Sequence, residues 1–126
     1  MTTELSVEQQ TPAQTVIATV EGWEGVTSQP HRFGGIEFGA GGRELGHLHD
    51  DRLADLLLPK YAHDEAIAAG RAQPHHILPN SNWVSVYLHR PEQAEDVITL
   101  LRLAYERAVA HPVRRRSAQW NLKAAS

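Results

Sequence analysis

Two histidines that alternate along one short stretch are the residues best placed to do chemistry in this chain. The stretch Gly41–Asp50 reads G-G-R-E-L-G-H-L-H-D, and its histidines, His47 and His49, are two residues apart. Side chains alternate across a β-strand, so an extended stretch projects both imidazole rings from the same face. Imidazole titrates near neutral pH and ligates divalent metals, so the pair predicts acid–base or metal chemistry.

The elements that must position this pair favour an α+β fold, with one largely antiparallel sheet and helices packed on one side. Alternation and turn residues predict strands at about 26–32, 36–38, 43–49 and 83–89, with a hairpin turn at 39–42. The apolar run at 53–58 has the length of a strand but also fits a helix. Helical spacing predicts helices at about 12–21 and 63–69, and a long C-terminal helix that begins at Pro91. Short connections between consecutive strands favour antiparallel pairing.

Length and composition fit one domain of modest charge. The 126 residues are 41% hydrophobic and predict a domain at 12–111, between a flexible segment at 1–11 and a basic tail at 112–126 that contains Arg114–Arg116. The formal net charge of −3 gives no electrostatic case for nucleic acid or membrane binding. The chain has no cysteine, which excludes disulfides and thiolate metal sites. We therefore expect a cytoplasmic protein with a small-molecule ligand; the sequence predicts no oligomeric state.

Six motifs are spread along the chain: P-H-R-F-G-G-I-E-F (Pro30–Phe38), G-R-E-L-G-H-L-H-D (Gly42–Asp50), L-A-D-L (Leu53–Leu56), P-H-H-I-L-P (Pro74–Pro79), N-W-V-S-V (Asn82–Val86) and L-L-R-L-A-Y-E-R (Leu100–Arg107). With these motifs the chain resembles the luciferase-like domain family over roughly residues 15–110. The family comprises small bacterial proteins of unknown function and is related to the luciferases of bioluminescent fungi. Those enzymes oxidise 3-hydroxyhispidin, a hydroxylated pyranone, with molecular oxygen and no known added cofactor. The resemblance therefore implies a small-molecule oxidation of this kind.

The first hypothesis is oxidation without a cofactor. An enol or phenol bound beside His47 and His49 could lose a proton to one ring, and the resulting anion is electron-rich enough to react with oxygen. The residues expected to take part in catalysis are His47, His49, Arg43 and His75. The residues expected to bind the substrate, with an aromatic wall for a flat molecule, are Glu37, Glu44, His76, Trp83 and Tyr87.

The second hypothesis is a divalent metal site. His47 and His49 on one strand face, with a third histidine or a carboxylate, would form an open three-ligand site for Zn, Fe or Mn. The spacing begins like the cupin metal motif, but Asp55 comes slightly later than the glutamate of that motif. Either Glu37 across the hairpin or His75 is expected to supply the missing ligand.

The third hypothesis is a non-catalytic binding or interaction module. Glu44, His47 and His49 would then form a hydrogen-bonded cluster with Arg43 that stabilises the hairpin. In that case the strand aromatics Trp83 and Tyr87 would pack against a helix. This hypothesis explains the same residues without any chemistry.

Overall fold

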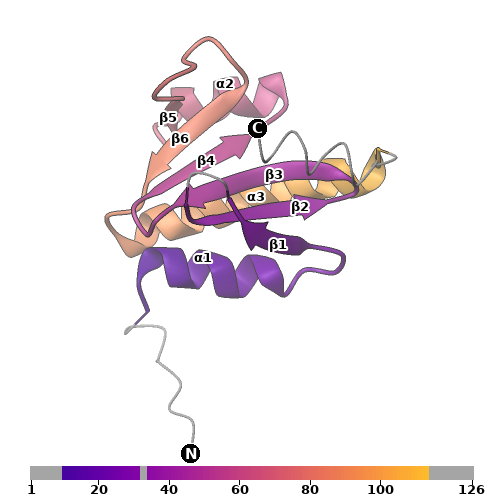
Figure 1. The fold of residues 1–126 in the computed structure, drawn as a ribbon. Coiled ribbons are helices and arrows are strands. Elements are labelled where there is room, and N and C mark those ends of the chain that lie inside the picture. The colour runs from indigo at the N-terminus through magenta and orange to yellow at the C-terminus, as the bar shows by residue number, and fades with distance from the viewer. Residues whose placement is uncertain (1–9, 32–33, 114–126) are drawn as a thin grey trace, which may run out of the picture.

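A six-stranded antiparallel sheet is the framework of the described residues in a computed structural model of the chain (Figure 1). Its strands are β1 (Thr27–Pro30), β2 (Ile36–Ala40), β3 (Arg43–His49), β4 (Leu53–Leu57), β5 (Gln73–Pro74) and β6 (Trp83–Tyr87). They lie in the order β1-β2-β3-β4-β6-β5. The structure describes residues 10–31 and 34–113. Most of the predicted flexible N-terminal segment, and the tail from Arg114 onward, lie outside these ranges.

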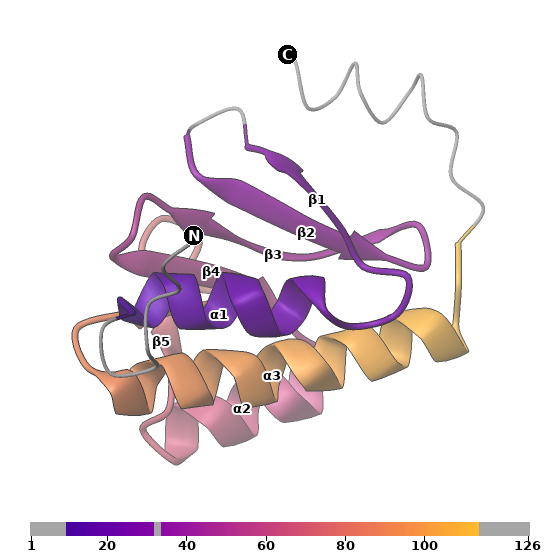
Figure 2. The same cartoon turned by 90° about the horizontal axis from the view of Figure 1, so that it is seen from below.

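The described helices are α1 (Pro12–Glu21), α2 (Lys60–Ala68) and α3 (Pro91–Ala110), and they lie on one side of the sheet (Figure 2). Helix α1 begins with a capping box, in which the Thr11 side chain accepts from the Gln14 N–H and the Gln14 side chain accepts from the Thr11 N–H. Both α1 and α3 have proline in their first turn, where its missing N–H costs no hydrogen bond. The predicted α+β fold is confirmed. None of the described helices has the length and apolar character that a membrane span requires.

The core lies between the helices and one face of the sheet. The sheet contributes the buried side chains of Phe38, Leu48, Ala54, Leu56, Val84 and Val86. Helices α1 and α3 contribute buried side chains that include Val16, Val20, Val97 and Leu101. Burial of each large apolar side chain stabilises the fold by roughly 1.5–3 kcal/mol. Residues 53–57 of the apolar run at 53–58 form the inner strand β4, a run that the apolar pattern alone left open between strand and helix.

The other face of the sheet carries one row of polar side chains across all six strands. Neighbouring residues of this row stand opposite one another in the strand register: Gln29, Glu37, His47, Asp55, Ser85 and Gln73. At its centre Asp55 and Ser85 are fully buried, and Glu37 and His47 are also buried. Buried polar groups must be hydrogen-bonded to be tolerated, so this row is where a functional site is to be sought.

A β-bulge in β3 decides which side chains join this row. Phe38 pairs with Gly46, but the next residue of β2 pairs with Glu44, so Leu45 is an extra residue on β3. The bulge turns Leu45 into the core and brings Glu44 to the face of His47. Gly46 is needed because a Cβ atom there would lie 2.6 Å from the backbone oxygen of Asp55.

Candidate functional site

Four imidazole rings converge on a single carboxylate oxygen. The Oδ2 atom of Asp55 lies 2.8 Å from Nε2 of His49, 3.2 Å from Nε2 of His76, 3.3 Å from Nε2 of His75 and 3.5 Å from Nε2 of His47. His47 and His49 come from β3, Asp55 from β4, and His75 and His76 directly follow β5. We call these five residues the histidine cluster. It unites the β3–β4 hairpin with a segment that follows at least 20 residues later in the sequence.

The carboxylate of Asp55 is held as an anion in this cluster. Its Oδ1 atom accepts a hydrogen bond of 2.7 Å from the Ser85 hydroxyl, which leaves Oδ2 facing the rings. Burial would raise the pKa of Asp55, but hydrogen bonds from His47, Ser85 and the other histidines outweigh burial and hold that pKa far below its ordinary value. The site therefore contains a fixed negative charge that is screened from solvent.

His47 is fixed from its other side by Glu44. The His47 Nδ1–H donates to Glu44 Oε2 over 2.7 Å, which leaves Nε2 directed at Asp55. Burial opposes the charged ring, but the hydrogen bonds and charges of Asp55 and Glu44 outweigh it and raise the pKa of His47 to about 9. A carboxylate that orients a histidine in this way is the usual outer partner of a metal-ligating histidine.

The surroundings of His75 favour its neutral form, whereas those of His47 favour the charged form. Its Nδ1 atom accepts hydrogen bonds from the backbone N–H groups of Ile77 (3.1 Å) and Leu78 (3.0 Å). Burial, with the neighbouring charges of His76 and His47, lowers the pKa of His75 despite the attraction of Asp55. A neutral ring that accepts at Nδ1 carries its proton on Nε2, so His75 donates to Asp55 and has no lone pair to offer a metal.

The ligand atoms of His47, His49 and Asp55 fit a divalent cation. One carboxylate oxygen has two lone pairs and cannot accept good hydrogen bonds from four rings. Four ligand atoms around a metal with bonds of about 2.1 Å lie about 3.4 Å apart at tetrahedral angles. The distances of 2.8 and 3.5 Å from Asp55 Oδ2 to Nε2 of His49 and His47 bracket this value, and the ligand atoms of these three residues lie within 4.8 Å of one another. His47, His49 and Asp55 therefore form a candidate set of two histidines and one carboxylate, whereas His76 groups with Asp55 and His75.

Aromatic side chains border the cluster. The ring of His31 stacks on His47 with centroids 4.1 Å apart and planes 15° apart. The indole ring of Trp83 lies 5.3 Å from the ring of His47 and 6.1 Å from that of His75. These rings exclude water from part of the site and provide flat surfaces beside it.

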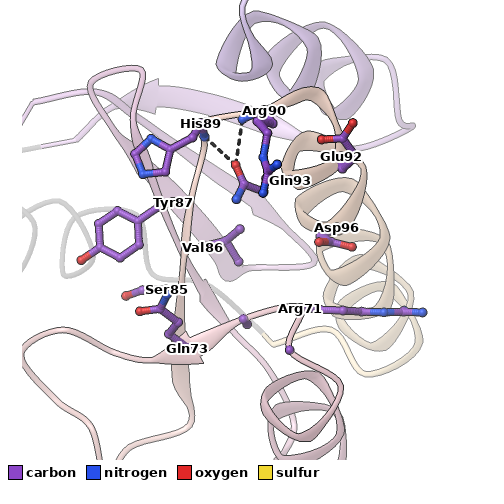
Figure 3. A pocket seen from close by; sticks show the side chains of 12 residues that line it. Arg71, Gln73, Ser85, Val86, Tyr87, His89, Arg90, Glu92, Gln93 and Asp96 are labelled. Carbon is purple, nitrogen blue, oxygen red and sulfur yellow. Dashed lines mark hydrogen bonds between the residues drawn. The ribbon is translucent and has the colours of Figure 1, made fainter.

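Most of the residues expected from the sequence lie at this site. The structure brings together His47, His49, His75, His76, Glu44 and Trp83, and it places Glu37 opposite His47 in the register. Two others point elsewhere. The Nε–H of Arg43 donates to the His111 carbonyl over 3.0 Å, at the end of α3. Tyr87 stacks on His89, with ring centroids 6.0 Å apart, where both line a separate cleft (Figure 3).

Three residues of the site, Asp55, Ser85 and His31, were not predicted from the sequence. Asp55 had a detectable signal, because a single carboxylate inside the apolar run L-A-D-L-L-L needs buried partners. Ser85 had a weaker signal of the same kind, as the small polar residue of W-V-S-V-Y. His31 had none, because its approach to His47 depends on the folded arrangement.

The raised pKa of His47 makes the stability of the metal-free protein depend on pH. The folded state holds a proton on His47 up to about pH 9, whereas the unfolded state loses it near 6.5. Stability should therefore fall as pH rises from 6.5 through 9, by on the order of 3 kcal/mol. Urea unfolding in the presence of a chelator measures this loss. His47→Gln should remove the alkaline loss, and a wild-type stability that stays constant between pH 6.5 and 9.5 would contradict the assignment.

The fold and the histidine cluster define a small α+β domain with a buried histidine–carboxylate site. Among known protein families, the model described as "Luciferase domain" matches residues 42–104, which is half of the chain. This span runs from the hairpin turn before β3 into α3 and contains the whole cluster. The chain belongs to the Luciferase domain family. No curated protein and no solved structure matches it.

Proposed function

We propose that this protein holds one divalent transition-metal ion in the histidine cluster and uses it to oxidise a small molecule. The ligands are Nε2 of His47, Nε2 of His49 and Oδ2 of Asp55. The substrate class is an enol or phenol, the reaction consumes molecular oxygen, and the expected cytoplasmic location is part of this proposal. The observation that carries it is the convergence of these two imidazole nitrogens on a buried carboxylate oxygen, with the three ligand atoms within 4.8 Å of one another.

The residues around the proposed ligands have defined roles. Glu44 accepts from Nδ1 of His47 and keeps the lone pair of Nε2 directed inward. Ser85 and His75 donate to Asp55 and fix its orientation. Such outer partners set the direction and basicity of metal ligands. A bound ion would polarise the oxygen of an enol or phenol and stabilise its anion.

The wall formed by Trp83 and His31 suits a flat substrate. The ring of His31, just after β1, and the ring of Trp83, at the start of β6, both approach His47 and border the cluster with aromatic faces. Small-molecule sites combine such apolar surfaces with a few convergent polar groups. The surroundings of Asp55 combine aromatic rings with convergent polar side chains in this way.

One observation favours a second candidate, oxidation without a metal. At neutral pH a His47 ring with a pKa of about 9 is charged and could hold an enolate, while it cannot accept a proton. The base would then be His49, whose Nε2 lies 2.8 Å from Asp55. The two candidates differ in their response to a chelator.

Oxygen consumption with hydroxypyranones tests the proposal. Protein loaded with iron or manganese should consume oxygen in an oxygen electrode, and chelator-treated protein should not. The zinc-loaded protein shows whether polarisation of the substrate oxygen is sufficient, because zinc takes the same ligands and polarises oxygen but has no redox chemistry. Consumption that persists after chelation would favour the metal-free candidate. If neither the loaded nor the chelated protein consumes oxygen with this substrate class, both candidates fail.

A further inference from the structure

A second cleft lies where the ends of β3 and β4 meet the C-terminal half of α3. Its volume of about 500 Å³ falls in the range of small-molecule sites. Its lining includes Arg43 from β3, Leu57 at the end of β4, Leu58 just beyond it, and Arg107 from α3. Val113, just beyond α3, completes one side. This cleft is separate from the cleft of Figure 3, which lies against the first turns of α3.

Two arginines of this cleft have no acidic partner among the described residues. The Nε–H of Arg43 donates to the carbonyl of His111, which holds the planar guanidinium in place and leaves its terminal amino groups available. Arg107 forms no ion pair with a described residue. Guanidinium groups bind carboxylates through paired, charge-assisted hydrogen bonds.

The acidic residue that lines the cleft does not cancel this charge. Glu44 belongs to the lining, but its Oε2 atom accepts from the ring of His47 over 2.7 Å. Its negative charge is therefore directed into the histidine cluster. The cleft keeps a net positive character.

Part of the cleft wall is apolar. Leu45 and Leu58 are buried beneath it, while Leu57 is 39% exposed and Val113 is 44% exposed. An apolar group that covered Leu57 and Val113 would remove this surface from water, which is favourable in proportion to its area. The cleft thus combines two guanidinium groups with an apolar surface.

We propose that this cleft binds an organic carboxylate with an apolar body, such as a medium-chain fatty acid. The carboxylate lies at Arg43 and Arg107, and the apolar body covers Leu57 and Val113. The histidine cluster takes no part in this binding. The inference therefore goes beyond the proposed function and does not depend on it.

Calorimetric titration with octanoate tests the proposal. The wild-type protein should bind octanoate, and Arg43→Gln and Arg107→Gln should each weaken binding about 10-fold or more. Arg71→Gln is the matched control, because this guanidinium lines the other cleft and should leave binding unchanged (Figure 3). Octanol, which lacks the charge, and acetate, which lacks the body, should both bind at least about 10-fold more weakly than octanoate.

Arg107→Gln keeps the test valid if Arg43→Gln fails to fold, because Arg107 makes no side-chain hydrogen bond to a described residue. Circular dichroism checks the fold of each variant. The proposal is overturned if the wild-type protein does not bind octanoate, if Arg107→Gln binds it as tightly as wild type, or if octanol binds equally well. Metal content should be the same in wild type and Arg107→Gln, which separates this result from any failure of the metal proposal.

Discussion

Asp55→Asn should abolish tight zinc binding and destabilise the metal-free protein. The substitution keeps the shape of the side chain but removes the charge toward which His47, His49 and His76 are directed. Loss of an outer partner typically weakens a metal site roughly 10–100-fold, so loss of a ligand should weaken this one more than about 100-fold. The metal-free protein should lose about 3–5 kcal/mol of stability, because a buried charged partner of His47 disappears.

Chelator competition measures the zinc affinity, and urea unfolding in the presence of chelator measures the stability. Asp51→Asn is a matched control, since this exposed carboxylate lies in the turn between β3 and β4, outside the cluster. It should change neither quantity appreciably. Wild-type zinc affinity in Asp55→Asn would mean that this carboxylate is not a ligand.

Two histidines of the cluster should respond very differently to the same substitution. His49→Asn should weaken zinc binding more than about 100-fold, because it removes a proposed ligand. His75→Asn should weaken it by about 10-fold or less, because His75 acts only on the carboxylate of Asp55. Asparagine can also accept from the backbone N–H groups of Ile77 and Leu78, so it preserves the turn that His75 forms.

The comparison decides which tautomer of His75 the protein uses. Equal losses in the two variants would show that both rings ligate the metal. A larger loss in His75→Asn would place the ligand at His75 and would contradict the role assigned to its Nδ1 atom. Both variants are to be compared with His89→Ala, which removes a ring that stacks on Tyr87 outside the cluster.

The fold was largely predictable because its signals are local. Thr11 and Pro12 predicted the start of α1, Pro91 the start of α3, and the glycines at 39–42 the hairpin between β2 and β3. The second helix begins at Lys60, directly after Pro59, and therefore earlier than the predicted start at 63. The apolar run at 53–58 fits a strand and a helix equally well. Only the pairing of β4 with β3 and β6 shows that this run forms a strand.

The site was predictable only in part because it depends on register and on contacts between distant segments. Alternation from His47 places Arg43 on the same face and Glu44 on the other, but the bulge at Leu45 reverses this assignment. A one-residue change of register moves every preceding side chain to the opposite face. The approach of His75 and His76 to Asp55 follows from the pairing of β6 with both β4 and β5, which no local pattern reports.

The most direct test of the metal centre is the metal content of purified, untagged protein after dialysis without chelator. Inductively coupled plasma mass spectrometry should find about one zinc, iron or manganese ion per chain in wild type and in His89→Ala. The double variant His47→Ala, His49→Ala should contain almost none, since it removes two proposed ligands. A wild-type protein that contains no metal and takes up none from added zinc, iron or manganese would contradict the metal centre.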